Sequence, residues 1–235
     1  MRTMRIEESL KQFVSSSNIK IDHVVDVGVQ WGTPFLIEAF PDAKHWLIEP
    51  VREYHQKIME RYEGMRFRLM PYAVSDSDGL LLLHEYDLDQ KGRVSHSTLR
   101  NEKVDSPYLV AVSNVETRKL DNMFVESPFQ DFTYIVKIDV DGMEEKIIAG
   151  GQSMLRKASL VIVEAPLWAL QQRLGLIQQL SFNLWDICDP AYYYDQLHQV
   201  DLVFVNSEIK KSNINFRPWD KTNGALDRSK WQWRF

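Results

Sequence analysis

Cysteine is nearly absent from this chain of 235 residues, in which Cys188 is the only one. A single cysteine excludes an intrachain disulfide and argues against a cysteine-based zinc site. The apolar runs, such as residues 80–83, are far shorter than a membrane-spanning helix requires. The N-terminal stretch MRTMRIEESLKQF also lacks the apolar centre of a signal peptide. We therefore expect a soluble, cytoplasmic protein that does not associate with a membrane.

A basic surplus is also missing, because the formal net charge is −5. This balance argues against a nucleic-acid binder. Positive charge collects only in residues 207–235, which hold seven Lys or Arg against three acids and are rich in aromatics. Because disordered tails are poor in aromatics, we expect this tail to pack on the domain or on a second subunit, which leaves a homodimer open. The alternative is a lid or a site for an anionic substrate.

Short apolar segments alternate with amphipathic ones along most of the chain. This order predicts an α/β fold, a Rossmann-like doubly wound sheet of seven mostly parallel strands with an antiparallel strand near the C-terminus. We expect a single domain, with an N-terminal helix over 1–20, a core over 20–206 and the tail over 207–235. The expected strands cover 23–28, 45–50, 65–74, 132–140, 160–166, 182–187 and 200–206, with an added strand at 79–86.

A polar stretch from Asp87 to Pro107 shows no clear periodicity, and we expect a loop there. Loops of this length in compact domains usually carry function. In sheets of the predicted kind, ligands bind outside the carboxyl ends of the strands. Residues that follow strands therefore deserve the most weight as site candidates.

The stretch DVGVQWG, residues 26–32, joins the first expected strand to the first expected helix of the core. Glu49 ends the second strand, where an acid can accept hydrogen bonds from both hydroxyls of a ribose. Together they predict a nucleoside site, whereas incidental glycines in a plain turn are the alternative. The spacing is not G-x-G-x-x-G, and Val29, Gln30 and Trp31 crowd the place of a pyrophosphate. The acidic Asp26 favours a cationic ligand without phosphate, such as S-adenosylmethionine.

Several blocks of the chain resemble a known family in the same order. VVDVGVQWGTPFLIEAFPDAKHWLIEP resembles the first two motifs of class I S-adenosylmethionine-dependent methyltransferases. YIVKIDVDGMEEKIIAGG, residues 134–151, resembles the hallmark of the FkbM-type family, and YAVSDSDG, SHSTL, VETRKLDNM, LVIVEAP and LWDI agree in order. The resemblance covers about residues 20–206. The chain departs from the family at Gln30, where Asn is common, and at Asp141, where Glu is usual.

The resemblance implies S-adenosylmethionine as the cofactor. The residues that it and the turn assign to cofactor binding are Asp26, Gly28, Val29, Gln30, Gly32, Thr33, Glu49, Pro50, Ala73, Val74, Ser75, Ser97 and Asp139.

The resemblance further implies methyl transfer to an oxygen nucleophile, often a hydroxyl of a free or nucleotide-linked sugar. A weak nucleophile benefits from a base, and Asp139 and His96 are the catalytic candidates. The candidates for contacts with the acceptor are Ser95, Asp141, Glu144 and Glu164.

Each of these side chains also has a simpler interpretation. Asp139 could cap the next helix, Glu144 could be an acid in a first helical turn, and His96 could be a surface residue. Glu164 could support other side chains without touching substrate. A divalent metal at Asp139 and Asp141 stays open.

Three rival functions remain at this point. The first is a methyltransferase for a natural product, a lipid or an N-nucleophile. The second is a catalytically silent S-adenosylmethionine-binding partner. The third, a nicotinamide-dependent oxidoreductase, is disfavoured by the missing G-x-G-x-x-G.

Overall fold

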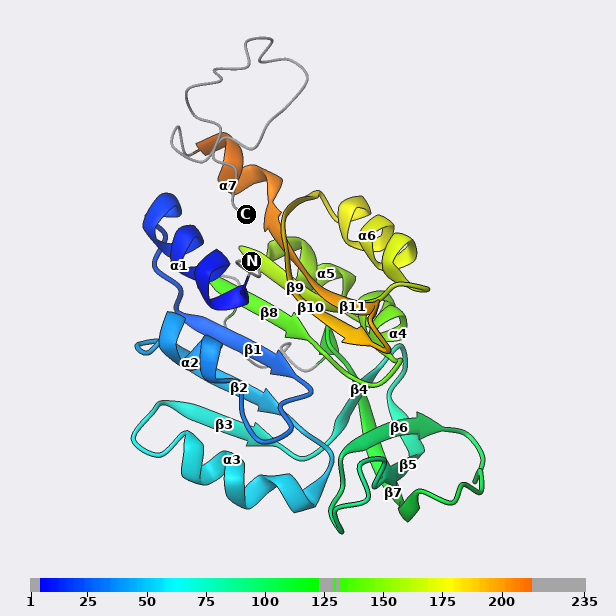
Figure 1. The fold of residues 1–235 in the computed structure, drawn as a ribbon. Helices are drawn as coiled ribbons and strands as arrows, with labels where there is room; N and C mark the ends of the chain where they lie inside the picture. The colour runs from blue at the N-terminus through cyan, green and yellow to red at the C-terminus, as the bar shows by residue number, and fades with distance from the viewer. Residues whose placement is uncertain (1–4, 123–128, 130–131, 213–235) are drawn as a thin grey trace.

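Buried, β-branched segments of the chain form a central seven-stranded sheet (Figure 1). The computed structural model describes residues 5–122, 129 and 132–212. The sheet has the order β10-β11-β9-β8-β1-β2-β3, and β11 runs antiparallel to both of its neighbours. Its strands are β1 (His23–Val27), β2 (Lys44–Ile48), β3 (Phe67–Met70), β8 (Tyr134–Ile138), β9 (Leu160–Pro166), β10 (Phe182–Tyr193) and β11 (Gln196–Asn206). This topology confirms the predicted Rossmann-like sheet with an antiparallel strand near the C-terminus.

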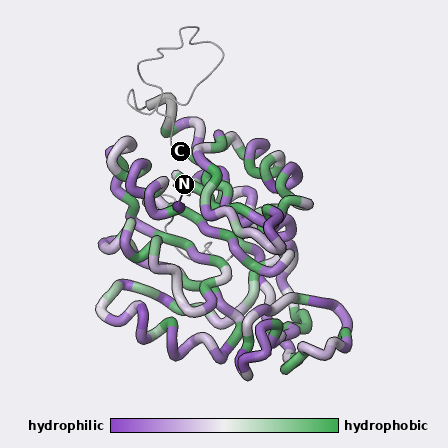
Figure 2. Tube along the Cα trace, viewed as in Figure 1, coloured by the Kyte–Doolittle hydropathy of each residue, from purple (hydrophilic) through white to green (hydrophobic). Residues whose placement is uncertain are grey.

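Helices cover both faces of this sheet. One face packs against α1 (Ile6–Ser17) and α2 (Pro34–Ala39), and Cys188 of β10 is fully buried in that layer. The other face packs against α4 (Glu144–Gly150), α5 (Gln152–Lys157) and α6 (Leu170–Gln179). In Figure 2 hydrophobic stretches run through the central strands, whereas the helices alternate between hydrophobic and hydrophilic residues. No helix in the described part of the chain is long and apolar enough to cross a membrane.

A second sheet of four strands lies beside the carboxyl ends of the first and was not predicted (Figure 1). Its order is β4-β7-β5-β6. Its strands are β4 (Ala73–Ser75), β5 (Gly79–Tyr86), β6 (His96–Arg100) and β7 (Leu109–Lys119). Between β2 and β3 the chain forms the short helix η1 (Arg52–Tyr54) and α3 (His55–Arg61). These pack against the second sheet through a shared apolar cluster.

Two sequence predictions in this region were wrong. The single strand expected over 65–74 is divided at Pro71, because proline has no N–H to continue the ladder, and β3 and β4 join different sheets. The expected loop over 87–107 contains β6, which pairs with β5 from Leu82↔Arg100 to Tyr86↔His96. The strand forms because β5, a separate segment of the chain, pairs with it. The polar sequence of β6 alone therefore did not predict a strand.

The C-terminal part of the chain leads away from the strand ends where ligands bind. β11 runs back to the amino ends of the parallel strands, where α7 (Ser207–Ser212) begins (Figure 1). Residues 213–235, most of the aromatic and basic tail, lie outside the described residues. Its predicted packing role stays a prediction.

Gly150, at the end of α4, packs closely against β4 of the second sheet, because a Cβ at this position would lie 2.4 Å from the Ser75 carbonyl oxygen. We expect Gly150→Ala to destabilise the protein by about 1–3 kcal/mol through this overpacking. Gly175 on α6 has open space around it, so Gly175→Ala should stabilise by about 0.4–1 kcal/mol. Urea unfolding of both variants tests this. Equal effects of the two substitutions would show that α4 does not pack closely on β4.

Candidate active site

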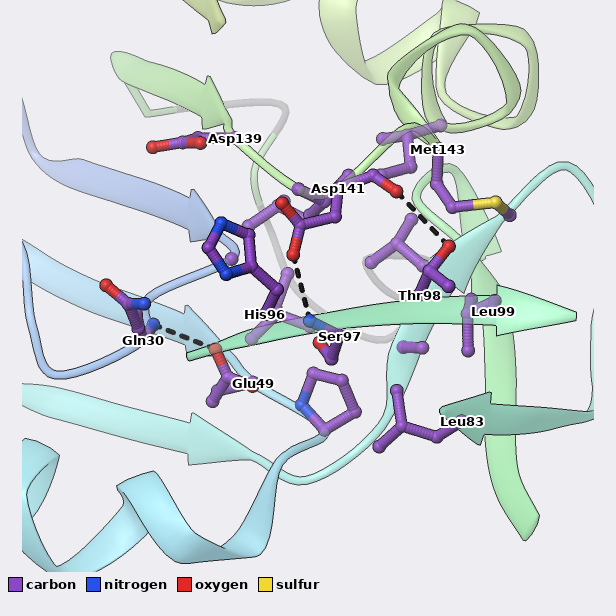
Figure 3. A pocket seen from close by; sticks show the side chains of 18 of the residues that line it. Gln30, Glu49, Leu83, His96, Ser97, Thr98, Leu99, Asp139, Asp141 and Met143 are labelled. Carbon is purple, nitrogen blue, oxygen red and sulfur yellow. Dashed lines mark hydrogen bonds between the residues drawn. The ribbon is translucent and has the colours of Figure 1, made fainter. Parts of the chain in front are cut away.

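A cavity of about 300 Å³ opens at the carboxyl ends of β1, β2, β8 and β9, and β6 covers one side of it (Figure 3). It is lined by Val27, Gly28, Gln30, Ile48, Glu49, Pro50, Tyr54, Ala73, Val74, Leu83, Ser95, His96, Ser97, Thr98, Leu99, Asp139, Val140, Asp141, Met143, Ile147 and Glu164. The cavity therefore lies at the edge of the sheet where the sequence led us to expect a ligand site.

The cavity has an apolar end and a polar end. Leu83, Leu99 and Met143 gather on one side in Figure 3. Gln30 and Asp139 lie on the other, with His96 and Asp141 between the two groups. The cavity can thus hold a ligand that has a flat apolar group at one end and a polar group at the other.

The glycine turn is shaped by the strand beside it. Gly28 has a φ of +81°, and a Cβ there would lie 1.8 Å from the Asp139 carbonyl oxygen. Only glycine permits this close approach of β1 to the end of β8. Gln30 also has a positive φ, +52°, and its backbone N–H donates to Glu49 Oε2 at 2.8 Å. The acid that ends β2 therefore fixes the turn that follows β1.

Glu49 is almost fully buried at the cavity wall, with 4% of its surface exposed. Its other oxygen, Oε1, accepts the Val51 N–H at 2.9 Å. Burial raises the pKa of Glu49 to about 7, although the two N–H donors oppose the shift. Each oxygen keeps a lone pair for a ligand hydroxyl. Glu49 thus presents a doubly hydrogen-bonded carboxyl group at the cavity wall.

Asp26 lies behind the turn and not on the cavity. It is fully buried, and its Oδ2 accepts the Thr33 hydroxyl at 2.6 Å. Its Oδ1 accepts a hydrogen bond from Lys137 Nζ at 3.2 Å. Both carboxylate oxygens thus have partners inside the protein, and the expected contact of Asp26 with a cationic ligand stays a prediction.

Lys137 connects the turn to β8 and was missed by the sequence analysis. Its Nζ contacts Asp26, the Gly28 carbonyl oxygen at 3.0 Å and Asp139 Oδ2 at 3.1 Å. Burial would lower the pKa of Lys137, but Asp139 and Asp26 raise it further than burial lowers it. The available signal was a lone cation inside the apolar strand YIVKI.

Five other predicted residues do not line the cavity. Val29 and Gly32 pack toward α3, and Thr33 binds Asp26. Ser75 is fully buried where β4 meets Gly150. The fifth, Glu144, is described below. Neighbouring protein groups surround these residues, and their predicted contacts with a ligand stay predictions.

Arg173 is a fully buried cation that binds Glu144 at 2.7 Å and Glu145 at 2.8 Å. It also donates to the Glu164 carbonyl oxygen at 2.6 Å. Burial raises the pKa of Glu144 to about 7, and Arg173 opposes that shift. The network ties α4 and α6 to the end of β9, which explains why Glu144 does not reach the cavity.

The strand β6 is held across the cavity from both sides. Gln30 Nε2 donates to the Ser95 carbonyl oxygen at 3.1 Å. On the other side, the Ser97 N–H donates to Asp141 Oδ2 at 2.9 Å, and the Thr98 hydroxyl donates to the Asp141 carbonyl oxygen at 3.2 Å (Figure 3). Burial raises the pKa of Asp141, and the Ser97 N–H opposes the shift. His96 and Ser97 therefore belong to a strand that borders the cavity, and Ser95 immediately precedes that strand.

Glu164 brings a further acid to the polar end. Gln199 Nε2 donates to Glu164 Oε1, and Asp201 lies opposite Glu164 in the β11–β9 register. Burial, followed by Asp139, raises the pKa of Glu164 to about 8 and that of Asp201 to about 7. Sequence analysis missed Asp201, whose signal was an acid within the apolar strand VDLVFV.

Nothing in the described residues supports the open metal hypothesis. In residues 5–122, 129 and 132–212, no group of three or more His, Cys, Asp or Glu side chains is arranged to hold a metal ion. Asp139 pairs with Lys137, and Asp141 accepts a hydrogen bond from β6. The two carboxylates thus already have partners in the protein.

We expect Glu164→Gln to gain stability relative to the natural chain as the pH rises from about 5 to about 9. The raised pKa means that folding favours protonated Glu164, so its contribution to stability is lost as the pH rises through about 8. Gln carries no charge at any of these values. His23 and His45, whose pKa values burial lowers, act in the opposite direction in both proteins and cancel in the difference.

The difference in thermal unfolding midpoint should reach about 3 °C or more at high pH. Glu63→Gln, at an exposed position next to α3, is the control and should leave the midpoint difference constant. A constant difference for Glu164→Gln as well would contradict the pKa shift.

Comparison with known proteins supports the sequence prediction. A model of the methyltransferase FkbM domain matches residues 26–199. The 2-O-methyltransferase NoeI of Sinorhizobium fredii is 26% identical over 156 residues, which span 60% of this chain and 62% of that protein. Among solved structures, an rRNA methylase from Streptococcus thermophilus has a TM-score of 0.51 at 10% identity and covers 88% of this chain and 98% of its own. That likeness shows the fold alone. The chain therefore belongs to the FkbM methyltransferase domain family, as the ordered motifs along residues 20–206 predicted.

Proposed function

We propose that this protein transfers a methyl group from S-adenosylmethionine to a hydroxyl of a sugar. The observation that carries the proposal is the polar end of the cavity, where Asp139, Glu164 and His96 line the wall together. Such side chains can hold a hydroxyl and accept its proton. The name of NoeI, a 2-O-methyltransferase, supports an oxygen acceptor.

The residues of the cavity fit the cofactor. Glu49 offers lone pairs to both hydroxyls of a ribose, and the apolar end of Leu83, Leu99 and Met143 suits a flat purine. The lining includes the acids Glu49, Asp139, Asp141 and Glu164, and no Lys or Arg occurs among the described residues that form it. This balance suits a ligand that carries sulfonium and ammonium groups and no phosphate. When bound, the cofactor supplies an electrophilic methyl group.

The chain's own residues position the acceptor and take up a proton. Asp139 binds Lys137 through Oδ2, which leaves Oδ1 free to orient a hydroxyl at the cavity. Glu164 has its pKa raised to about 8, close to the value that suits a base at neutral pH. We therefore assign orientation to Asp139 and proton uptake to Glu164. His96 faces them from β6 and adds a further hydrogen-bonding group.

We expect Glu49→Gln to weaken S-adenosylhomocysteine binding by about tenfold or more. Each oxygen of Glu49 accepts a backbone N–H, and the NH2 group of Gln would place a donor against one of these donors. Isothermal titration calorimetry measures this, and Glu60→Gln on the exposed side of α3 serves as the control. NAD should bind neither protein measurably. Tighter binding of NAD than of S-adenosylhomocysteine by the natural chain would overturn the cofactor assignment.

We expect Asp139→Asn and Glu164→Gln each to reduce kcat by about a hundredfold, the usual scale for loss of an acid–base group. S-adenosylhomocysteine affinity should stay within about twofold for Glu164→Gln. The assay follows labelled methyl transfer to a panel of sugar glycosides, with exposed Asp105→Asn as the control.

The pH profile separates the two roles. In the natural chain kcat should rise with pH up to about 8, and Glu164→Gln should remove that rise while Asp139→Asn keeps it. Unchanged turnover in Glu164→Gln would exclude Glu164 as the base.

A further inference from the structure

Four aromatic side chains stand exposed at the edge of the sheet that carries the cavity. Trp168 follows β9, and Tyr192, Tyr193 and Tyr194 form the tip of the β10–β11 hairpin. Their exposed fractions are 76%, 62%, 65% and 85%. We call these four residues the aromatic rim. Several exposed aromatic side chains in one region often mark a binding site, whereas exposed apolar side chains scattered singly are common and carry no such meaning.

The strand β11 links the rim to the acceptor end of the cavity. Glu164 lines the cavity and accepts a hydrogen bond from Gln199 on β11. One residue earlier on β11, the His198 carbonyl oxygen accepts the Leu167 N–H at 2.9 Å, and the His198 ring lies 6.1 Å from that of Tyr193. From Asp201, opposite Glu164, to Gln196, opposite Tyr193, β11 extends roughly 17 Å at about 3.3 Å per residue.

The hairpin tip holds its tyrosine in an unusual conformation. Tyr194 and Asp195 have φ values of +47° and +60°, the left-handed pair of a tight two-residue turn. Asn-Gly or Asp-Gly pairs are preferred in such turns, and an aromatic residue in the first position is disfavoured. The chain thus accepts a less stable turn that keeps three consecutive tyrosines in solvent, with the Tyr193 and Tyr194 rings 4.6 Å apart.

The chemistry of the surroundings selects the ligand. Aromatic faces pack against flat apolar surfaces, and tyrosine hydroxyls and nearby carboxylates hydrogen-bond to hydroxyl groups. The cavity contributes Asp139, Asp141 and Glu164, with no Lys or Arg among the described lining residues, and Asp195 adds an exposed acid at the tip. A phosphate or another anion would meet the carboxylates that line the cavity. Pyranose rings combine apolar C–H faces with neutral hydroxyls.

We propose that the aromatic rim binds the outer units of an uncharged oligosaccharide acceptor whose methylated unit enters the cavity beside Glu164. The inference rests on the proposed function, since it extends the same acceptor site outward. It disfavours the nucleotide-linked sugars that the sequence left open, because the described residues that line the cavity include no Lys or Arg to pair with a diphosphate. The roughly 17 Å of β11 gives room for two or three sugar rings.

The test compares acceptors of different length. Methyl transfer is measured with neutral monosaccharide glycosides, neutral trisaccharides and nucleotide diphosphate sugars, using the natural chain and Trp168→Ala/Tyr193→Ala. Tyr108→Ala, a partly exposed tyrosine beside the second sheet, is the matched control. The natural chain and the control should prefer trisaccharides by about tenfold in kcat/KM, and the double variant should lose this preference while monosaccharide turnover stays unchanged.

Three outcomes would overturn the inference. The first is an unchanged trisaccharide preference in the double variant, and the second is a preference for nucleotide sugars. The third is a dimer, seen by light scattering, that the double substitution separates without affecting trisaccharide preference, which would make the rim a subunit interface. If no saccharide is methylated although S-adenosylhomocysteine binds, the proposed acceptor class itself fails, and the rim variants have no part in that result.

Discussion

The arrangement of the site depends on the buried ammonium group of Lys137. It forms ion pairs with Asp26 and Asp139 and donates to the carbonyl oxygen of Gly28, so the segments that meet at the carboxyl edge share one cation. A buried carboxylate without a partner costs several kcal/mol, and removal of one member of such a group typically costs about 3–5 kcal/mol. The turn after β1, the end of β8 and the orientation of Asp139 are therefore one unit.

A second buried cation organises the other half of the edge. Arg173 binds Glu144 and Glu145 of α4 and the carbonyl oxygen of Glu164 at the end of β9. Its planar guanidinium can serve several acceptors at once, which an ammonium group at that place could not do with the same geometry. The two cations lie behind the cavity wall, whereas the acids Glu49, Asp139, Asp141 and Glu164 line it. The cavity wall is thus lined by acids because Lys137 and Arg173 both lie behind it.

Local sequence pattern was sufficient for the central sheet and insufficient for the second one. β1 and β9 agree closely with the predicted ranges 23–28 and 160–166, because each is a short apolar segment bounded by turn residues. β6 was missed because His96–Arg100 becomes a strand only through pairing with β5. Leu83 and Leu99 could not be assigned to the cavity for the same reason, since their place depends on how that sheet packs over the strand ends. Asp26 shows the converse limit: its importance was visible in the motif, but the partners that decide its role, Thr33 and Lys137, were not.

The lone cysteine has a practical meaning for studies of this protein in solution. Cys188 is fully buried between β10 and α1, and burial raises the pKa of its thiol, so very little reactive thiolate exists while that layer is intact. A thiol reagent can reach it only when α1 separates from the sheet or the whole chain unfolds. The rate of Cys188 modification therefore reports opening of this layer without any engineered probe. For the same reason, a cysteine introduced at the surface would be the single fast-reacting thiol on the folded chain.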